Sequence, residues 1–210
     1  MSGRIHDISQ VLRPGMPVWP GDTDFAFDRT WRMDEGSPVN VGRMVMSTHS
    51  GTHADAPLHY AENGLDAASM ALDPYLGPCL VVDARQAKDA LRVADLPDLD
   101  GAARVLVRSW DRFPHDEWRS DWLAIAAETI DWLAEQGVVL IGTDAPSVDP
   151  QESKTMDAHK AVLRNDMRIL EGLVLDDVPQ GWYELIALPI KVGGGDAGLC
   201  RAILRELPDA

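Results

Sequence analysis

Alternating apolar and polar positions predict β-strands in the first quarter of the chain. Residues 25–32 and 39–48 alternate with the period of two that is typical of strands with one buried face, and residues 5–12 predict a short strand that runs into a turn. Between them, residues 13–22 hold three prolines and two glycines, which favours a rigid extended loop. Trp19 lies in this loop, where it either lines a pocket or plugs the edge of the core.

Further along, strands are predicted by continuous apolar runs. Apolar runs without alternation, as in strands buried on both faces, cover residues 79–83, 104–108 and 138–142. Helical spacing is found over 129–136, where Gly137 is a typical C-cap, and over 158–163. We expect a turn or short helix over 87–91, and further strands within 168–176, 183–191 and 200–205. Strand, helix and apolar strand in succession predict an α/β fold, a single domain over residues 1–210 with a mixed β-sheet core and flanking helices.

Composition and charge restrict the partners and the compartment. The chain has 210 residues, of which 45% are hydrophobic and 25% charged, as is ordinary for a globular protein. Its formal net charge of −15 argues against nucleic acid and membrane partners, because both are polyanions. We find no apolar run of transmembrane length and no signal-peptide core. Cys79 and Cys200 lie in apolar contexts and are expected to be buried free thiols in a cytoplasmic protein.

The densest chemistry lies in residues 47–59, which hold three of the six histidines of the chain. His49, His53 and His59 occur within eleven residues, with Asp55 between the second and the third. Imidazole nitrogens and a carboxylate suit Zn²⁺, Mn²⁺ or Fe²⁺, so this segment predicts much of a metal site. The alternative is a polar loop whose histidines bond only to the backbone. Glycine and proline near these residues favour a strand end followed by an irregular turn.

Two distant residues are candidate partners of this cluster. His159 follows a polar, proline-containing stretch, and Glu171 interrupts an apolar run. A buried carboxylate is usually paired or bound to a metal. Glu171 instead faces solvent if its segment is amphipathic. The sequence has neither a GxSxG nucleophile elbow nor a phosphate-binding loop, which disfavours a serine hydrolase and a nucleotide-binding protein.

The metal-binding segment carries a resemblance to a known family. Residues 49–59 read His-Ser-Gly-Thr-His-x-Asp-x-Pro-x-His, which is similar to the signature of the cyclase-like metal-dependent hydrolases. More closely, the chain resembles the bacterial kynurenine formamidases (arylformamidases). Matching segments extend over nearly all of it and cover residues 7–9, 17–23, 38–43, 49–59, 153–159, 169–177 and 184–189.

The resemblance implies a two-zinc site on a swivelling β/β/α-type fold, in a homodimer or higher homo-oligomer. The ligands of the family fall on His49, His53, Asp55, His159 and Glu171, with Asp55 bridging the two metals, and Mn²⁺ is an alternative to Zn²⁺. His59 falls on the general acid and base, and Trp19 falls on the aromatic residue that contacts the substrate. The chain departs from the family at residues 196–199, Asp-Ala-Gly-Leu, where Asp-x-Ser-Pro is usual. This departure affects the last loop of the pocket but no metal ligand.

The activity that the resemblance implies is the hydrolysis of N-formyl-L-kynurenine to L-kynurenine and formate, a step of tryptophan degradation. The substrate is then a small aryl formamide. One alternative is a cyclase-family amidohydrolase that acts on another amide or lactam, such as isatin. A more distant alternative is a metal-binding module without catalysis, which His59 disfavours, since a closed metal site needs no further histidine nearby.

Overall fold

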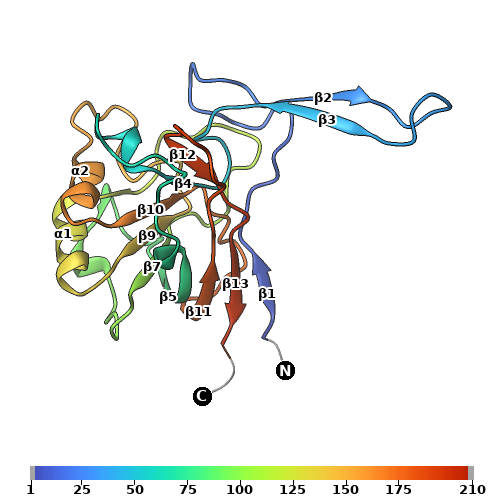
Figure 1. Cartoon of the computed structure of the whole chain (residues 1–210). Coiled ribbons are helices and arrows are strands. Elements are labelled where there is room, and N and C mark those ends of the chain that lie inside the picture. The colour runs from blue at the N-terminus through green and yellow to red at the C-terminus, as the bar shows by residue number, and fades with distance from the viewer. Residues whose placement is uncertain (1–2, 208–210) are drawn as a thin grey trace.

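Most strands join one sheet in the computed structural model, which describes residues 3–207. This nine-stranded sheet has the order β1-β13-β11-β5-β7-β9-β10-β4-β12 (Figure 1). Neighbours among β5, β7, β9 and β10 pair in parallel, and the strands on both sides of them pair antiparallel. The strands of the sheet are β1 (Ile5–Asp7), β4 (His53–Asp55), β5 (Leu76–Asp83), β7 (Arg104–Arg108), β9 (Leu140–Thr143), β10 (Arg168–Glu171), β11 (Gly181–Ile186), β12 (Ala197–Leu199) and β13 (Ile203–Glu206).

The other elements lie outside this sheet. Two α-helices, α1 (Ala127–Glu135) and α2 (Asp157–Arg164), are packed side by side along it (Figure 1). Two small strand pairs are formed by β2 (Ala26–Trp31) with β3 (Val41–Val45) and by β6 (Ala90–Leu91) with β8 (Ala124–Ile125). Short 3₁₀ turns cover Pro57–His59, Asp73–Tyr75 and Val93–Asp95. None of the helices within residues 3–207 has the length and apolar character needed to cross a membrane.

The central strands are buried on both faces, which accounts for their continuous apolar runs. Successive side chains of β7 enter two different hydrophobic clusters: Val105 and Val107 enter one, and Leu106 enters the other. The first cluster is covered by the two helices, through side chains such as Ile130 of α1 and Val162 of α2. The helices therefore hold one face of the parallel strands and place the N-terminus of α2 near the ends of β9 and β10.

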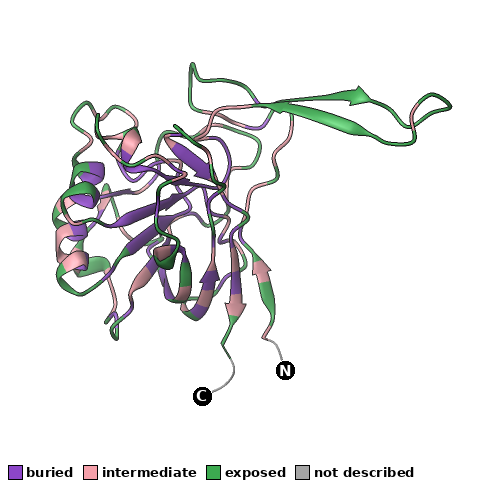
Figure 2. Cartoon of the chain, viewed as in Figure 1, coloured by how far each residue is buried: buried purple, intermediate pink, exposed green. Residues whose placement is uncertain are grey.

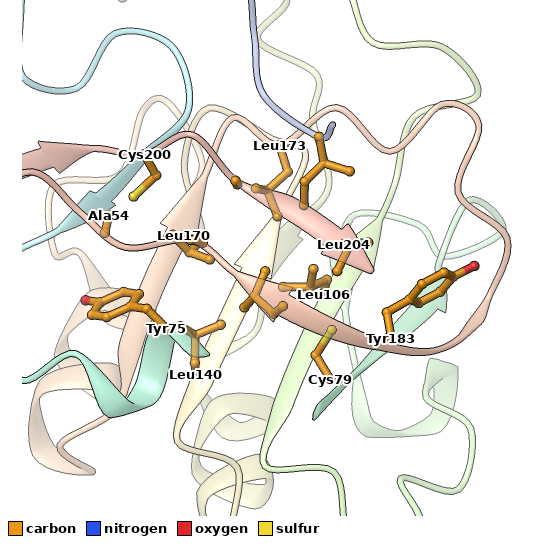
Figure 3. Close-up of a cluster of buried hydrophobic side chains, with 14 of the residues drawn as sticks. Ala54, Tyr75, Cys79, Leu106, Leu140, Leu170, Leu173, Tyr183, Cys200 and Leu204 are labelled. Atoms are coloured by element: carbon orange, nitrogen blue, oxygen red, sulfur yellow. The ribbon is translucent and has the colours of Figure 1, made fainter. Parts of the chain in front are cut away.

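The second cluster is enclosed by the sheet itself. It brings together residues from both ends of the strand order, including Leu204 of β13 and Ala54 of β4 (Figure 3). The residues after β1 complete the closure, because the amide of Ile8 bonds to Ala202 and its carbonyl accepts a bond from Val174. The sheet thus curls around its own core, and β4 lies between β10 and β12 at the end where the candidate ligands gather.

The hairpin of β2 and β3 projects away from the body of the molecule (Figure 1). Every residue of both strands is exposed (Figure 2). Several of these residues are large and apolar, among them Phe27, Trp31 and Met44, which are 49%, 59% and 54% exposed. We call this hairpin the arm. The alternation of apolar and polar residues predicts both strands correctly. However, neither face of the arm is buried, so the alternation does not mark a face that packs on the core.

The predicted fold class is confirmed, with corrections to individual elements. A mixed sheet with flanking helices is observed, and both helices and the run 104–108 lie within a few residues of their predicted bounds. His53 and Asp55 lie on strand β4, not in an irregular turn. Residues 90–91 form a short strand where a turn or short helix was predicted, because they pair with β8. The alternative of a solvent-facing Glu171 is wrong, since it is 3% exposed. Cys79 and Cys200 are buried free thiols, as predicted.

Candidate metal centre and active site

Strands β4 and β10 supply three of the candidate ligands. His53 and Asp55 are two residues apart on β4, so their side chains project from the same face of the sheet. Glu171 on β10 is the register partner of His53. Nε2 of His53 lies 3.3 Å from Oδ1 of Asp55 and 3.5 Å from Oε2 of Glu171, and all three side chains are buried.

His49 and His159 approach the same carboxylates from two further segments. His49 lies in the turn before β4, with its Nδ1 3.1 Å from Oδ1 of Asp55 and 3.3 Å from Nε2 of His53. His159 lies in the first turn of α2, with its Nε2 3.2 Å from Oδ2 of Asp55 and 3.8 Å from Oε1 of Glu171. Asp55 and Glu171 each direct one oxygen toward His53 and the other toward His159. The cluster therefore presents two adjacent sets of ligand atoms that share the two carboxylates.

Hydrogen bonds outside the cluster orient its side chains. Nδ1 of His53 donates to the carbonyl of Gly51 over 3.0 Å, and Nδ1 of His159 donates to Oδ2 of Asp149 over 2.6 Å. Each of these bonds leaves Nε2 facing the cluster as an acceptor, the form that binds a metal ion. Oε1 of Glu171 accepts a bond from the amide of Val148 over 2.9 Å. Asp149 also accepts bonds from the amides of Ala158 and His159, so it fixes the start of α2 as well as the imidazole.

Gly172 allows the segment after β10 to pack closely against the turn before β4. Its φ of +63° lies in the left-handed region, and an added Cβ would lie 2.7 Å from the carbonyl oxygen of Gly51. Its own carbonyl accepts bonds from Oγ1 of Thr52 over 2.6 Å and from Nε2 of Gln10 over 2.9 Å. These contacts hold Glu171 beside His53.

The two buried carboxylates draw positive charge into the cluster. Burial works to lower the pKa of His53, but the attraction of the neighbouring carboxylates of Asp55 and Glu171 outweighs it and raises the pKa to about 10. The pKa of His159 rises to about 10 in the same way, with burial opposed by Asp149 and Asp55. Burial and the charge of Asp55 raise the pKa of Glu171. Without a metal ion, protons on histidines supply the charge that balances these carboxylates.

The donor set fits a divalent metal ion. Ligand atoms of His53, Asp55 and Glu171 all lie within 4.8 Å of one another, and so do those of His49, Asp55 and His59. Within the described residues, Nε2 of His49 and Oδ1 of Asp55 are buried and have no hydrogen-bond partner. Buried carboxylates that lack full pairing are expected to coordinate metals. Nitrogen and oxygen donors in this combination suit Zn²⁺ or Mn²⁺.

His59 lies at the rim of the cluster, at the end of the turn Pro57–His59. Its ring centroid is 4.0 Å from that of His49 and 5.7 Å from that of His159, and its side chain is accessible from the pocket. Desolvation by the surrounding atoms, together with repulsion from His49 and His159, lowers its pKa to about 4, against the attraction of Asp55. A neutral imidazole in this position is able either to accept a proton or to bind a metal ion.

A pocket of about 350 Å³ opens above the cluster. His49, His53, His59, His159 and Glu171 form part of its lining. The aromatic side chains of Trp19, Phe113 and Trp118 form another part of the lining. The ring centroids of Trp19 and Trp118 are 5.4 Å apart. Six of the seven sequence-predicted site residues therefore line this pocket: Trp19 and the five named above. The seventh, Asp55, lies at the centre of the ligand cluster below them.

Comparisons with known proteins identify the family. The sequence pattern of the family described as "Putative cyclase" matches residues 6–150. The chain belongs to the cyclase family. Within this family, it is 79% identical to the kynurenine formamidase of Erythrobacter litoralis (strain HTCC2594), over 99% of this chain and 96% of that protein. It is also 57% identical to the kynurenine formamidase of Maricaulis maris (strain MCS10), over 98% of this chain and 99% of that protein.

Solved structures resemble this cyclase-family chain over almost its whole length. A protein described as a potential metal-dependent hydrolase with cyclase activity superposes with a TM-score of 0.83 at 29% identity, covering 98% of this chain and 99% of its own. Isatin hydrolase A from Labrenzia aggregata, bound to benzyl benzoate, superposes with a TM-score of 0.80 at 25% identity, covering 96% of this chain and 93% of its own. The metal-dependent hydrolase fold is thus shared along the full sheet.

Several residues of the cyclase-family site were not predicted from the sequence. Asp149 orients His159, and its place between Val148 and Pro150 gave no sign of this. Trp118 and Arg119 line the pocket from a loop whose three tryptophans within residues 110–122 were the one available signal. Asp196, in the loop that departs from the family pattern, lies with its Oδ2 3.5 Å from Nε2 of His49. This loop therefore still brings a carboxylate to the edge of the cluster.

Proposed function

We propose that this chain hydrolyses N-formyl-L-kynurenine to L-kynurenine and formate. The observation that carries the proposal is a cluster of metal-ligand type that forms the floor of a pocket with aromatic walls. Hydrolysis of an aryl formamide needs both: the metal-ligand cluster acts on the amide bond, and the aromatic walls bind the aryl ring. The relationship to the kynurenine formamidase of Erythrobacter litoralis supports the choice of this substrate among aryl amides.

The proposed cofactor is Zn²⁺, two ions per subunit, with Mn²⁺ as the alternative. His49, His53, Asp55, His159 and Glu171 would hold the ions, with Asp55 offering one oxygen to each ligand set. When bound there, a divalent ion acidifies a coordinated water and polarises the formyl oxygen. The hydrogen bonds that the imidazoles donate to the Gly51 carbonyl and the Asp149 carboxylate keep them in the required orientation.

The side chains of the chain supply proton transfer and orientation. His59, neutral at neutral pH, accepts the proton of the attacking water and donates it to the aniline nitrogen as the C–N bond breaks. Trp19 and Trp118 lie where the aryl ring enters and contact its face or edge. The water oxygen ends in formate, and the released amine carries the transferred proton.

A second candidate function is the hydrolysis of isatin. The likeness to isatin hydrolase A supports it, because that protein shares this fold and is named for the hydrolysis of isatin, which is a lactam. Formanilides and isatin share an aryl ring with an amide nitrogen attached, so ligand geometry alone does not separate them. A metal-binding module without turnover is the third possibility. Kinetics on these substrates separate all three.

We also propose that the protein is a homodimer or higher homo-oligomer, with the arm as the contact. The arm exposes apolar residues on a two-stranded hairpin that makes no core of its own, and isolated hairpins are marginally stable in water. The proposed occupant is a second copy of the chain, whose arm would present the same exposed apolar side chains. The two buried free thiols support a cytoplasmic location.

The deciding experiment combines metal analysis with turnover of the purified protein on N-formyl-L-kynurenine, isatin and formanilide. We expect bound zinc or manganese and a kcat/KM for N-formyl-L-kynurenine well above that for the other two. A higher kcat/KM for isatin would favour the second candidate. Bound metal with no turnover of any substrate would identify a metal-binding module.

A further inference from the structure

Arg119 is the one arginine or lysine among the residues that line the pocket. The other charged lining residues, histidines apart, are the acids Asp22, Glu117 and Glu171. The chain as a whole carries a formal charge of −15, so its field disfavours the entry of an anionic group. A substrate with a carboxylate therefore needs a local cation, and among the described residues of the pocket wall Arg119 is the arginine or lysine that supplies one.

The guanidinium of Arg119 is held in place from two sides. Nε donates to Oδ1 of Asp121 over 2.9 Å, and Nη2 donates to Oδ2 of the same carboxylate. Its central carbon lies 4.6 Å from the centre of the Trp110 ring, in a cation–π contact. These contacts use one edge and one face of the group. Within the described residues Nη1 has no hydrogen-bond partner, and the side chain is 40% exposed.

Glu117 places a negative charge beside this cation. It lines the same pocket two residues before Arg119. Asp121 first, and then Glu117, raise the pKa of Arg119, so the guanidinium stays charged. An α-amino acid carries a carboxylate and an ammonium group on one carbon. Opposite charges at neighbouring positions of one loop are complementary to that pair.

We propose that Arg119 is the specificity residue for the amino-acid end of the substrate, binding its carboxylate through Nη1, with Glu117 receiving the ammonium group. This inference rests on the proposed function and deepens it, because an aryl formamide without an amino-acid group does not use these residues. A planar guanidinium that is already fixed loses little conformational entropy on binding a carboxylate. The same loop, residues 109–123, supplies Phe113 and Trp118 to the wall that contacts the aryl ring.

The test compares three substrates: N-formyl-L-kynurenine, N-formylkynuramine, which lacks only the carboxylate, and formanilide, which lacks the whole side chain. For Arg119→Gln we expect KM for N-formyl-L-kynurenine to rise about tenfold with little change in kcat, since a charge-assisted bond made in both ground and transition states is lost. KM for the other two substrates should change less than about twofold. Arg119→Lys should fall between the wild type and Arg119→Gln.

Arg112→Gln is the matched control, because Arg112 lies in the same loop, pairs with Asp176 and does not line the pocket. It should leave all three KM values unchanged. An equal loss on all three substrates would show that Arg119 only holds the loop through Asp121 and Trp110, and would overturn the inference. Unchanged kinetics would overturn it as well. Failure of the wild type to hydrolyse any of the three substrates would instead reject the proposed function.

Discussion

His59 differs from the other histidines of the cluster in being exposed and in having a lowered pKa. We therefore expect His59→Asn to keep its metal while kcat falls by about 10²–10⁴-fold, the usual contribution of a general acid or base. Metal content by elemental analysis and kcat for N-formyl-L-kynurenine measure the two effects separately. His6→Asn is the control, since His6 pairs with Glu206 on the far strands β1 and β13. Loss of metal from His59→Asn would make His59 a ligand.

Asp149 acts on the cluster through His159. Its 2.6 Å bond to Nδ1 sets the tautomer that presents Nε2 to the metal position. In Asp149→Asn the carboxylate charge is lost, and we expect metal affinity to fall about 10–100-fold, as for other carboxylates behind metal-bound histidines. Competition with a chelator of known affinity measures this. Asp157→Asn changes an exposed acid in the same first helical turn and should leave the affinity unchanged. A weakening that is equal in both variants would point to the helix terminus instead.

Asp144 is a buried acid outside the metal cluster. Its carboxylate accepts bonds from the amides of Ser109 and Trp110, so it fixes the start of the loop that forms the pocket wall. Burial raises its pKa to about 6 from 3.8. Between these values the native protein holds a proton that the unfolded chain has lost. The stabilisation is therefore complete below about pH 4 and disappears as pH rises through 6.

The neutral variant Asp144→Asn isolates this effect. The free energy of unfolding of the wild type minus that of the variant should fall by on the order of 3 kcal/mol between pH 4 and 7. Urea unfolding of both proteins at four pH values in this range measures this difference in unfolding free energy. All other titratable groups are present in both proteins, so their contributions cancel in the difference. A difference that does not vary with pH would mean that Asp144 titrates at its ordinary pKa.

At the residue scale, the sequence predicted ligands better than the residues that position them. His49, His53 and Asp55 are recognisable because three donors of one chemistry lie within a few residues. Asp149 orients His159, ten residues further along the chain, and Arg119 lines the pocket from a loop. A lone aspartate or arginine in a loop carries no local signal. His159 and Glu171 came from the family resemblance and from a charged residue in an apolar run. Only the curled sheet shows why Glu171 lies opposite His53.

At the element scale, boundaries were predicted where burial determines the pattern. The run 104–108 corresponds to β7, because both faces of this strand are covered. Strand β4 was missed because glycine and proline flank only three residues, and its pairing with β10 and β12 depends on chain segments more than a hundred residues away. Short strands of this kind are defined by their partners rather than by their own propensities.

The arm supports a prediction at the same scale. We expect the double variant Trp31→Glu, Met44→Glu to lose the oligomer, because two charges would be buried in the proposed contact while neither residue belongs to the core. Light scattering after size-exclusion chromatography measures the mass, and the melting temperature shows that the subunit still folds. Leu72→Glu is the control, since Leu72 is 50% exposed but lies outside the arm. A monomeric wild type would reject the contact.

At the scale of the whole molecule, the metal cluster joins four segments. The turn before β4 and β4 itself are about a hundred residues away in the chain from α2 and β10. The unfolded chain cannot hold their ligand atoms together, so a metal ion binds mainly the native state and stabilises it. At a free metal concentration of about 100 times the Kd this amounts to about 2.7 kcal/mol. For a chain of this length each kcal/mol shifts Tm by about 2–4 °C.

Removal of the metal should therefore lower Tm by about 5–11 °C, with activity lost in parallel. Differential scanning calorimetry of the wild type before chelation, after chelation and after addition of Zn²⁺ measures the shift and its reversal. In Asp55→Ala, which removes one of the two carboxylates shared by both ligand sets, Tm should not respond to the chelator or to Zn²⁺. A wild-type Tm that stays constant while elemental analysis shows the metal removed would mean that the four segments are held by their own hydrogen bonds alone, and that the cluster is preformed without its ion.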